Sequence, residues 1–215
     1  MGTYIKGIHG GTSGKVGNVI GANWRSIDYW RSLSRKSNKP ATQEQLDVRH
    51  IFDMVSKFLK PAAGLIKAGY PKEKNKTAMN TALSYHITNT VTGVSPNFTI
   101  DYKKAKFCKG PLLAAQGTFA SAVASASVGV TWDASGGVLG KYDNADKAVI
   151  LIYNPTRGAY VMLGDGAIRS DLEVTVTVPA SFVGDLVHVW MYFMEASGKN
   201  PLLSDSVHVG MVTVI

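Results

Sequence analysis

Residues 148–163 read AVILIYNPTRGAYVML, two apolar runs separated by the turn residues NPTRG. Asn, Pro and Gly within one short stretch indicate a turn, and short runs of Val, Ile, Leu and Tyr are typical of buried strands. We therefore predict strands at 148–153 and 159–163, joined by a tight turn. This pair sets the pattern for the whole C-terminal half of the chain.

Short strands and turns continue on both sides of this pair. Five further strands are expected, each bounded by turn-forming residues: 117–123, 127–132, 172–178, 186–194 and 206–214. Seven such strands in about 100 residues are typical of a β-sandwich of the immunoglobulin or fibronectin type III kind. Trp132 and Trp190 are the expected core aromatics. The single cysteine, Cys108, excludes the disulfide of antibody domains.

A helical segment is expected upstream of these strands. Thr42 and Gln45 match a capping box, which marks a helix start. The residues that follow include apolar side chains at helical spacing: Val48, Ile51, Phe52, Val55, Phe58, Leu59 and Ala62. Pro61 should kink or end this helix. A second helix is predicted at 76–89 and a connecting strand at 98–107.

The first thirty residues are rich in glycine between short segments such as 15–20 and 23–30, which indicates strands joined by glycine turns. Trp24, Tyr29 and Trp30 are too large for so short a segment to bury alone. We expect them to pack on the rest of the chain or on a neighbouring subunit.

The predicted fold is therefore α+β and mostly β, in three parts. A Gly-rich basic arm of β structure occupies residues 1–40, a helical segment with its connecting strand occupies 41–110, and the immunoglobulin-like sandwich occupies 111–215. We expect the last part to fold alone.

The charge changes sign at the second boundary. The chain has 23 Lys and Arg against 15 Asp and Glu, a net charge of +8. Residues 1–110 carry 18 basic and 6 acidic side chains, a net charge of +12, whereas residues 111–215 carry 5 and 9, a net charge of −4. Opposite charges on one chain favour head-to-tail assembly of copies. Basic residues interleaved with aromatics are also typical of nucleic-acid contacts, and the third interpretation is that the charges only keep the protein soluble.

No complete motif for catalysis, a cofactor or a metal is found. The stretch HGGTSGKV resembles a P-loop, but it has His9 where the motif needs glycine and Val16 where it needs a hydroxyl. No two histidines have the spacing of a helical metal pair, and no Gly-x-Ser-x-Gly elbow is present. Lysines flank Cys108 and would lower its pKa, but no partner histidine is identifiable, so an inert thiol is expected. We predict no enzyme activity, no cofactor and no metal.

The apolar runs are short. None approaches the roughly 20 residues of a transmembrane helix, and the first thirty residues lack the apolar core of a signal peptide. We therefore expect no membrane partner and synthesis in the cytoplasm.

The N-terminal sequence MGTYIKGIHGGTSGKVGNVIGANWR, with NKPATQEQLDVRHIFDMVSKFLKP at 38–61, resembles the opening of a family of uncharacterised proteins of Bacteroidetes and their phages or prophages. A Gly-Gly-x-Ser-Gly-Lys-Val-Gly stretch, an Asn-Trp-Arg and a Lys-Pro-Ala-Thr-x-x-Gln-Leu-x-x-Arg run carry the resemblance, within residues 1–70. Because the family has no known function, the resemblance implies no catalytic residues. It implies glycines, aromatics and basic residues that serve packing and assembly.

These observations predict a non-enzymatic structural or assembly subunit, most concretely a component of a phage virion or tail-like particle. Its partners would be further copies or other particle proteins, and its final location the particle. The alternative is a nucleic-acid-binding protein. The expected assembly contact consists of Tyr4, Ile5, Trp24, Arg25, Tyr29 and Trp30. The expected nucleic-acid contact consists of Lys15, Arg25, Arg31, Arg35, Lys36 and Lys39.

Overall fold

The structure is a computed structural model that describes residues 3–4, 11–24, 27–35, 38–70, 76–135, 140–198 and 201–215. The chain divides into two compact units, Met1–Thr42 and Gln43–Ile215, called the N-terminal unit and the C-terminal unit below. The boundary expected after residue 40 lies beside this division, and the boundary expected after residue 110 falls inside the C-terminal unit.

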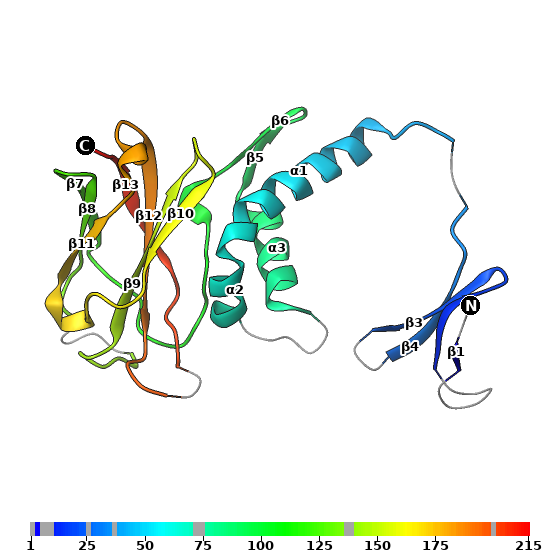
Figure 1. Ribbon diagram of the computed structural model, residues 1–215, viewed down its shortest axis with the longest axis horizontal. Helices are drawn as coiled ribbons and strands as arrows, with labels where there is room; N and C mark the ends of the chain where they lie inside the picture. Colours follow the sequence, from blue (N-terminus) through cyan, green and yellow to red (C-terminus); the bar gives the residue numbers. More distant parts are fainter. Residues whose placement is uncertain are drawn as a thin grey trace. The chain divides into compact units, whose positions relative to one another are not determined.

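The N-terminal unit is a four-stranded antiparallel sheet whose strands are neighbours in chain order (Figure 1). The strands are β1 (Thr3–Tyr4), β2 (Thr12–Val16), β3 (Val19–Trp24) and β4 (Ile27–Ser32). A turn at Gly17 divides the strand predicted at 15–20, because the residue has a φ of +58°, which glycine adopts without strain. The segment 23–30 likewise falls on two strands. Among the residues of this unit whose burial is described, only Gly21 is buried, and none of the buried apolar clusters includes a described residue of this unit.

Helices and one hairpin open the C-terminal unit. They are α1 (Gln43–Leu59), α2 (Ala63–Gly69), α3 (Ala78–Asn89), β5 (Val91–Val94) and β6 (Asn97–Ile100). A 3₁₀ turn that contains Pro61 separates α1 from α2, as the sequence predicts. The strand predicted at 98–107 is wrong beyond Ile100. There the Asp101 side chain accepts a hydrogen bond from the backbone N–H of Lys103 at 3.1 Å and starts a 3₁₀ turn, Tyr102–Lys104, in place of strand pairing.

The seven strands predicted beyond residue 111 are all present. They are β7 (Phe119–Val123), β8 (Ser127–Thr131), β9 (Lys147–Asn154), β10 (Ala159–Leu163), β11 (Glu173–Thr177), β12 (Leu186–Met194) and β13 (Val207–Thr213). They form two antiparallel sheets, β10-β9-β12-β13 and β11-β8-β7. The protein is therefore mostly β, with the helices in addition.

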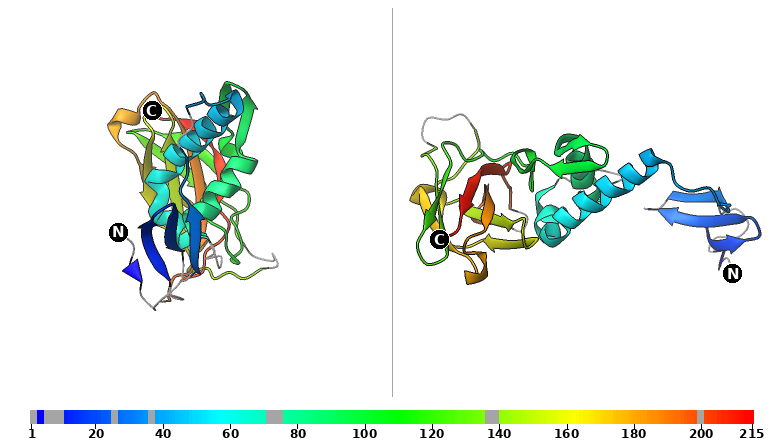
Figure 2. Two further views of the ribbon diagram at one scale, coloured as in Figure 1. Left: turned by 90° about the vertical axis from the view of Figure 1, so that its right-hand side faces the viewer. Right: turned by 90° about the horizontal axis from the view of Figure 1, so that it is seen from above.

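The four-stranded sheet is the middle of three layers (Figure 2). Along β9, Ile150 and Ile152 pack with the three-stranded sheet in one core, whereas Leu151 and Tyr153 pack with the helices in another. Trp190 of β12 belongs to this second core. Because both faces of the central strands are buried, their sequences are continuous apolar runs in place of an alternation.

The second core crosses the boundary expected after residue 110. Phe58 of α1 and Phe107 are buried in it, and the Phe107 ring lies 5.0 Å from the ring of Trp190, edge to face. The helices and the sandwich therefore bury one apolar surface together, which argues against the expectation that residues 111–215 fold alone.

This shared core predicts how fragments behave. A fragment of residues 43–215 should unfold in one cooperative transition, whereas a fragment of 111–215 should lose solubility and stability. The reason is that Leu151, Tyr153 and Trp190 become exposed, and each large apolar side chain contributes roughly 1.5–3 kcal/mol when buried. Urea titrations followed by tryptophan fluorescence measure this. Equal urea midpoints for the two fragments would contradict the shared core.

Candidate functional site

The N-terminal sheet separates its side chains onto two faces. Residues directly opposite one another in an antiparallel pair share a face, and neighbours along a strand alternate. The pairing of β2, β3 and β4 therefore defines an aromatic–basic face made of Lys15, Ile20, Ala22, Trp24, Ile27, Tyr29 and Arg31. Trp24, Ile27 and Tyr29 are 47%, 54% and 43% exposed. The strands thus bring together four of the residues predicted from sequence: Lys15, Trp24, Tyr29 and Arg31.

The opposite face carries Trp30, which pairs with Gly21, together with Val16 and Val19. The carboxylate of Asp28 also lies there and accepts a hydrogen bond from the side-chain amide of Asn23 at 2.7 Å. Asp28 is the single acidic residue in the sequence of this unit. Two predicted cations and two predicted aromatics therefore share a face without any described carboxylate.

The remaining predicted residues are more scattered. Tyr4 belongs to β1, where its backbone pairs with Thr12. Arg35 lines a hollow of about 640 Å³ at the end of β4, and Lys39 is exposed in the segment before α1. Three of the predicted contact residues and the histidine of the incomplete P-loop lie outside the described residues: Ile5, Arg25, Lys36 and His9.

A second exposed apolar surface lies on α1. Val48, Phe52, Val55 and Leu59 form one stripe along the helix, at spacings of four, three and four residues. Val55 and Leu59 are fully buried, whereas Val48 is 67% and Phe52 53% exposed. We call Val48 and Phe52 the exposed α1 face. The helix carries Glu44, Asp47 and Asp53 against Arg49 and Lys57, a net charge of −1, and Lys57 pairs with Asp53 at 2.8 Å.

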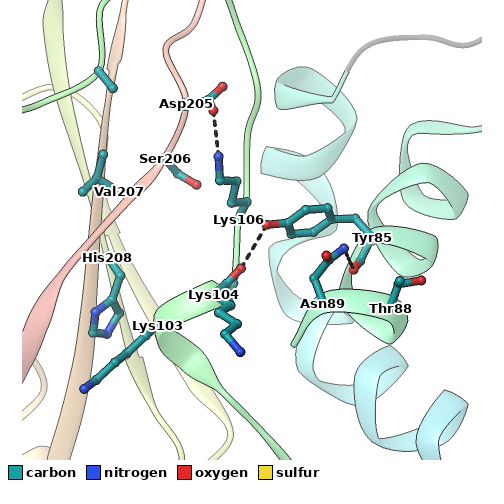
Figure 3. Close-up of a pocket in the computed structure, with 12 residues that line it drawn as sticks. Tyr85, Thr88, Asn89, Lys103, Lys104, Lys106, Asp205, Ser206, Val207 and His208 are labelled. Atoms are coloured by element: carbon teal, nitrogen blue, oxygen red, sulfur yellow. Dashed lines mark hydrogen bonds and ion pairs between the residues drawn. The ribbon is translucent and has the colours of Figure 1, made fainter. Parts of the chain in front are cut away.

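The C-terminal unit also contains a hollow of about 980 Å³, called the lysine pocket below (Figure 3). Lys103, Lys104 and Lys106 line one side, α3 contributes Tyr85, Thr88 and Asn89, and residues 205–208 complete the lining. The Lys106 ammonium is bound to Asp205 at 2.8 Å, and this hydrogen bond raises the pKa of Lys106. The Lys104 ammonium lies 3.4 Å from the Asp101 carboxylate. In the sequence, these lysines are notable only as neighbours of Cys108.

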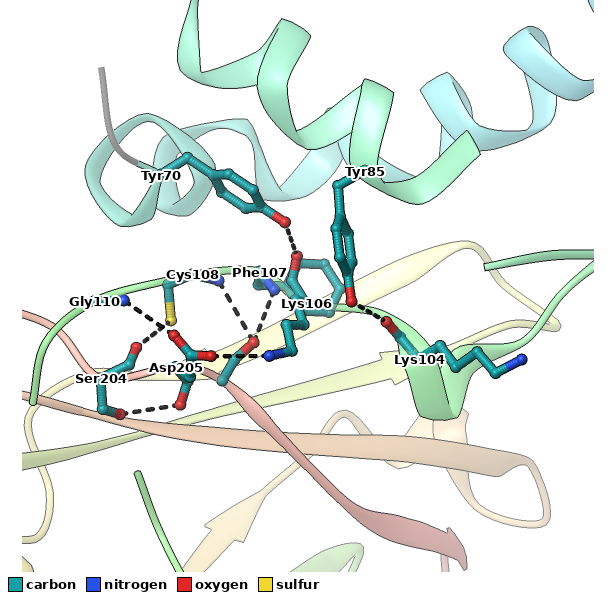
Figure 4. A network of polar contacts seen from close by, with 10 residues as sticks. Tyr70, Tyr85, Lys104, Lys106, Phe107, Cys108, Gly110, Ser204 and Asp205 are labelled. Carbon is teal, nitrogen blue, oxygen red and sulfur yellow. Dashed lines mark hydrogen bonds and ion pairs between the residues drawn. The ribbon is translucent and has the colours of Figure 1, made fainter. Parts of the chain in front are cut away.

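Beside the pocket, residues 105–110 form a bridging segment between the helices and the start of β13 (Figure 4). The Ser206 hydroxyl accepts hydrogen bonds from the N–H groups of Phe107 and Cys108 at 2.8 and 3.5 Å, and Asp205 accepts from that of Gly110 at 3.1 Å. On the helical side, the Tyr70 hydroxyl donates to the Lys106 carbonyl at 2.6 Å. The chain thus fixes this buried backbone from both sides.

Cys108 lies within the bridging segment and is fully buried. Its thiol donates to the Ser204 carbonyl at 3.3 Å, and burial raises the pKa of Cys108 above its ordinary value. The neighbouring lysines therefore do not activate it, and the geometry is that of the inert thiol expected from sequence.

His86 of α3 is fully buried against the same segment. Its Nδ1 lies 2.7 Å from the Ala82 carbonyl, and its Nε2 accepts a hydrogen bond from the N–H of Lys106 at 3.3 Å. These partners fit a neutral ring with the proton on Nδ1. Burial lowers the pKa of His86 to about 4, and the charge of Lys109 acts in the same direction.

Two further histidines meet across β12 and β13. Nδ1 of His188 lies 3.2 Å from Nε2 of His208, an arrangement that the separation of the two residues in sequence does not reveal. Burial and the neighbouring His208 lower the pKa of His188 to about 4. Within the described residues, no group of three His, Cys, Asp or Glu side chains gathers where a metal could bind.

A comparison with known protein families identifies the family of this chain. A family model described as a family of unknown function, DUF6266, matches residues 11–210, and the chain belongs to this family. The expectation of an uncharacterised family is thereby confirmed, and the match extends across both units. No curated protein matches the sequence. None of the helices in the described ranges has the length and apolar character needed to cross a membrane.

The lowered pKa of His86 predicts that the free energy of unfolding decreases in mild acid. This pKa is lowered in the folded chain and ordinary in the unfolded chain, so the unfolded chain binds the proton more readily between about pH 6.5 and pH 4. His86 alone should therefore reduce the free energy of unfolding by about 2 kcal/mol between pH 7 and pH 5.

Urea titrations at both pH values test this. His86→Gln should show a smaller loss on acidification than the wild type, whereas His50→Gln, on the exposed part of α1, should match the wild type. Identical pH dependence in all three proteins would contradict the role of His86.

Proposed function

We propose that the protein is a non-enzymatic structural subunit that assembles through its N-terminal sheet with further copies of itself. The observation that carries this proposal is the aromatic–basic face, where Trp24, Ile27 and Tyr29 are about half exposed. Exposed apolar surface of this kind marks interaction sites. Covering it in an assembly would stabilise both the sheet and the contact.

The exposed α1 face of a neighbouring copy is the surface that we propose for this contact. It presents Val48 and Phe52 among residues of net negative charge, whereas the N-terminal unit carries seven basic residues and one acidic residue, a net charge of +6. Two different complementary surfaces on one chain produce a head-to-tail contact, which repeats from copy to copy.

We further propose that the sandwich is of the immunoglobulin or fibronectin type III kind. In the constant immunoglobulin form, strands A, B, E and D face strands C, F and G. If β7 to β13 are assigned in chain order, with β10 as a fourth strand beside C, the sheets β11-β8-β7 and β10-β9-β12-β13 correspond to E-B-A and C′-C-F-G. This order supports the assignment, although a fold alone does not define a function.

The most concrete version is a component of a phage virion or tail-like particle from the Bacteroidetes, made in the cytoplasm and located in the finished particle. The resemblance of residues 1–70 to uncharacterised proteins of Bacteroidetes and their phages supports it. In this proposal the protein has no catalytic residue, cofactor or membrane partner, and other particle proteins are additional partners.

The second candidate function is nucleic-acid binding by the same sheet. The observation in its favour is that Lys15 and Arg31 share a face with Trp24 and Tyr29. Cations that contact phosphates beside aromatics that stack on bases are typical of single-strand binding. Such binding would weaken steeply with salt, and it would occur with the protein as a monomer.

Assembly predicts that substitutions on the aromatic–basic face dissociate the protein. Trp24→Ser with Tyr29→Ser should raise the dissociation constant of the oligomer by about a hundredfold or more, since two large apolar side chains leave the contact. Val48→Ser with Phe52→Ser should act in the same way. Light scattering coupled to size-exclusion chromatography measures the mass.

The matched control is Phe119→Ser with Met211→Ser, which removes two exposed apolar side chains from the sandwich and should leave the mass unchanged. A fragment of residues 43–215 should be folded and monomeric. A wild-type protein that is monomeric at high concentration would refute assembly, and salt-sensitive binding of single-stranded DNA by that monomer would favour the second candidate.

A further inference from the structure

We propose that the lysine pocket of the C-terminal unit is a binding site for phosphate groups, with Lys103 and Lys104 as the principal ligands. The site lies outside the N-terminal sheet, so it is separate from the proposed assembly contact. It also differs from the nucleic-acid residues predicted from sequence.

The charges of the segment leave an excess of positive potential. Four lysines lie within seven residues: Lys103, Lys104, Lys106 and Lys109. Asp205 binds Lys106 at 2.8 Å, and Asp101 lies 3.4 Å from Lys104. Across the residues that the structure describes, Lys103 has no acidic partner. The three lysines that line the pocket, set against these two carboxylates, leave a net charge of +1, which favours an anion. Lys109 adds a positive charge nearby, with its ammonium 4.1 Å from the centroid of the Tyr85 ring.

Both His208 and Lys103 line the pocket, and the pKa of His208 is sensitive to the positive charge there (Figure 3). Burial lowers the pKa of His208, and the charge of Lys103 lowers it further. The other groups facing His208 are His188 at 3.2 Å, the Trp190 ring and the Asp101 carboxylate, whose charge raises the pKa. An anion bound beside Lys103 would stabilise protonated His208 and raise its pKa.

The shape and chemistry of the hollow favour a polar ligand. Its volume of about 980 Å³ suits a ligand of nucleotide size, and apolar side chains contribute only Ala105, Ala114 and Val207 to the lining. Thr88, Asn89 and Ser206 supply polar groups around the lysines. Ammonium groups bind phosphate as point charges, without the planar geometry that arginine requires.

Two sources could present this chemistry, the backbone of a nucleic acid or a small free phosphate compound. Two probes separate them: inorganic pyrophosphate, and a fluorescently labelled single-stranded oligonucleotide. Both are titrated into the full-length protein. The first readout is the pH titration of the His208 imidazole by NMR, and the second is fluorescence anisotropy of the oligonucleotide.

The test variant is Lys103→Gln with Lys104→Gln, and its control is Lys57→Gln with Lys60→Gln. All four lysines are exposed, and both variants remove two positive charges from the C-terminal unit. Binding should raise the pKa of His208 in the wild type and the control. The test variant should bind about tenfold more weakly or worse, because it loses two charge-assisted contacts. Unchanged circular dichroism and urea midpoints show that the variants are folded.

The results with the two probes show which kind of phosphate ligand the pocket binds. If the oligonucleotide binds and the test variant lowers the salt slope by about one to two units, a nucleic-acid backbone occupies the pocket. If pyrophosphate alone raises the pKa of His208, the ligand is a free phosphate compound. The proposal is overturned if neither probe changes the His208 titration, or if the control variant loses as much affinity as the test variant.

Discussion

The C-terminal unit depends on one stretch of buried backbone, residues 105–110, which lies between the helices and the four-stranded sheet. Backbone N–H and C=O groups that leave water need partners, and here both sides supply them. Ser206 and Asp205 bind the N–H groups of Phe107, Cys108 and Gly110, and the carbonyl of Gly69 accepts from Lys109 at 2.8 Å. The segment therefore holds the helices on the sheet while Phe107 fills the core between them.

This constraint also explains where the charged groups lie. With Phe107 and Cys108 turned into the core, the neighbouring Lys103, Lys104 and Lys106 line the pocket at its edge. The buried imidazole of His86 couples the same backbone to α3 through the N–H of Lys106. The N-terminal unit has no comparable segment and no buried side-chain cluster among its described residues. Trp24, Ile27 and Tyr29 of its aromatic–basic face are about half exposed, and this exposed apolar surface is the physical basis of the proposed assembly.

Much of the strand pattern could be predicted from the sequence because turn residues separate the strands. The run at 148–153 is apolar throughout, and the run at 186–194 is interrupted only by His188, since the helices cover the face that would otherwise meet water. The strand predicted at 98–107 is wrong beyond Ile100 because of a local hydrogen bond. The sequence alternates like a strand, but the Asp101 side chain caps a turn within it. Hydrogen bonds from a side chain to the nearby backbone compete with strand pairing, and the tertiary contacts decide which of the two forms.

The candidate sites could also be predicted only in part from the sequence. The aromatics and cations of the N-terminal sheet could be recognised from composition, but their separation onto two faces follows from the register of β2, β3 and β4. The lysine pocket could not be predicted, because Lys103 and His208 line the same hollow only once β13 packs beside the turn Tyr102–Lys104. The spacing of apolar residues on α1 predicts one continuous core face. The structure shows that only Val55 and Leu59 of this face are buried, whereas Val48 and Phe52 are exposed.

The central claim is that the N-terminal sheet becomes buried only when copies assemble. Hydrogen exchange measured by mass spectrometry over a range of protein concentrations tests it most directly. Protection of the amides in β3 and β4 should increase with concentration, whereas amides of β9 and β12 should be protected at every concentration because their core lies within one chain. Concentration-independent protection of β3 and β4, equal to that of β9 and β12, would contradict the account.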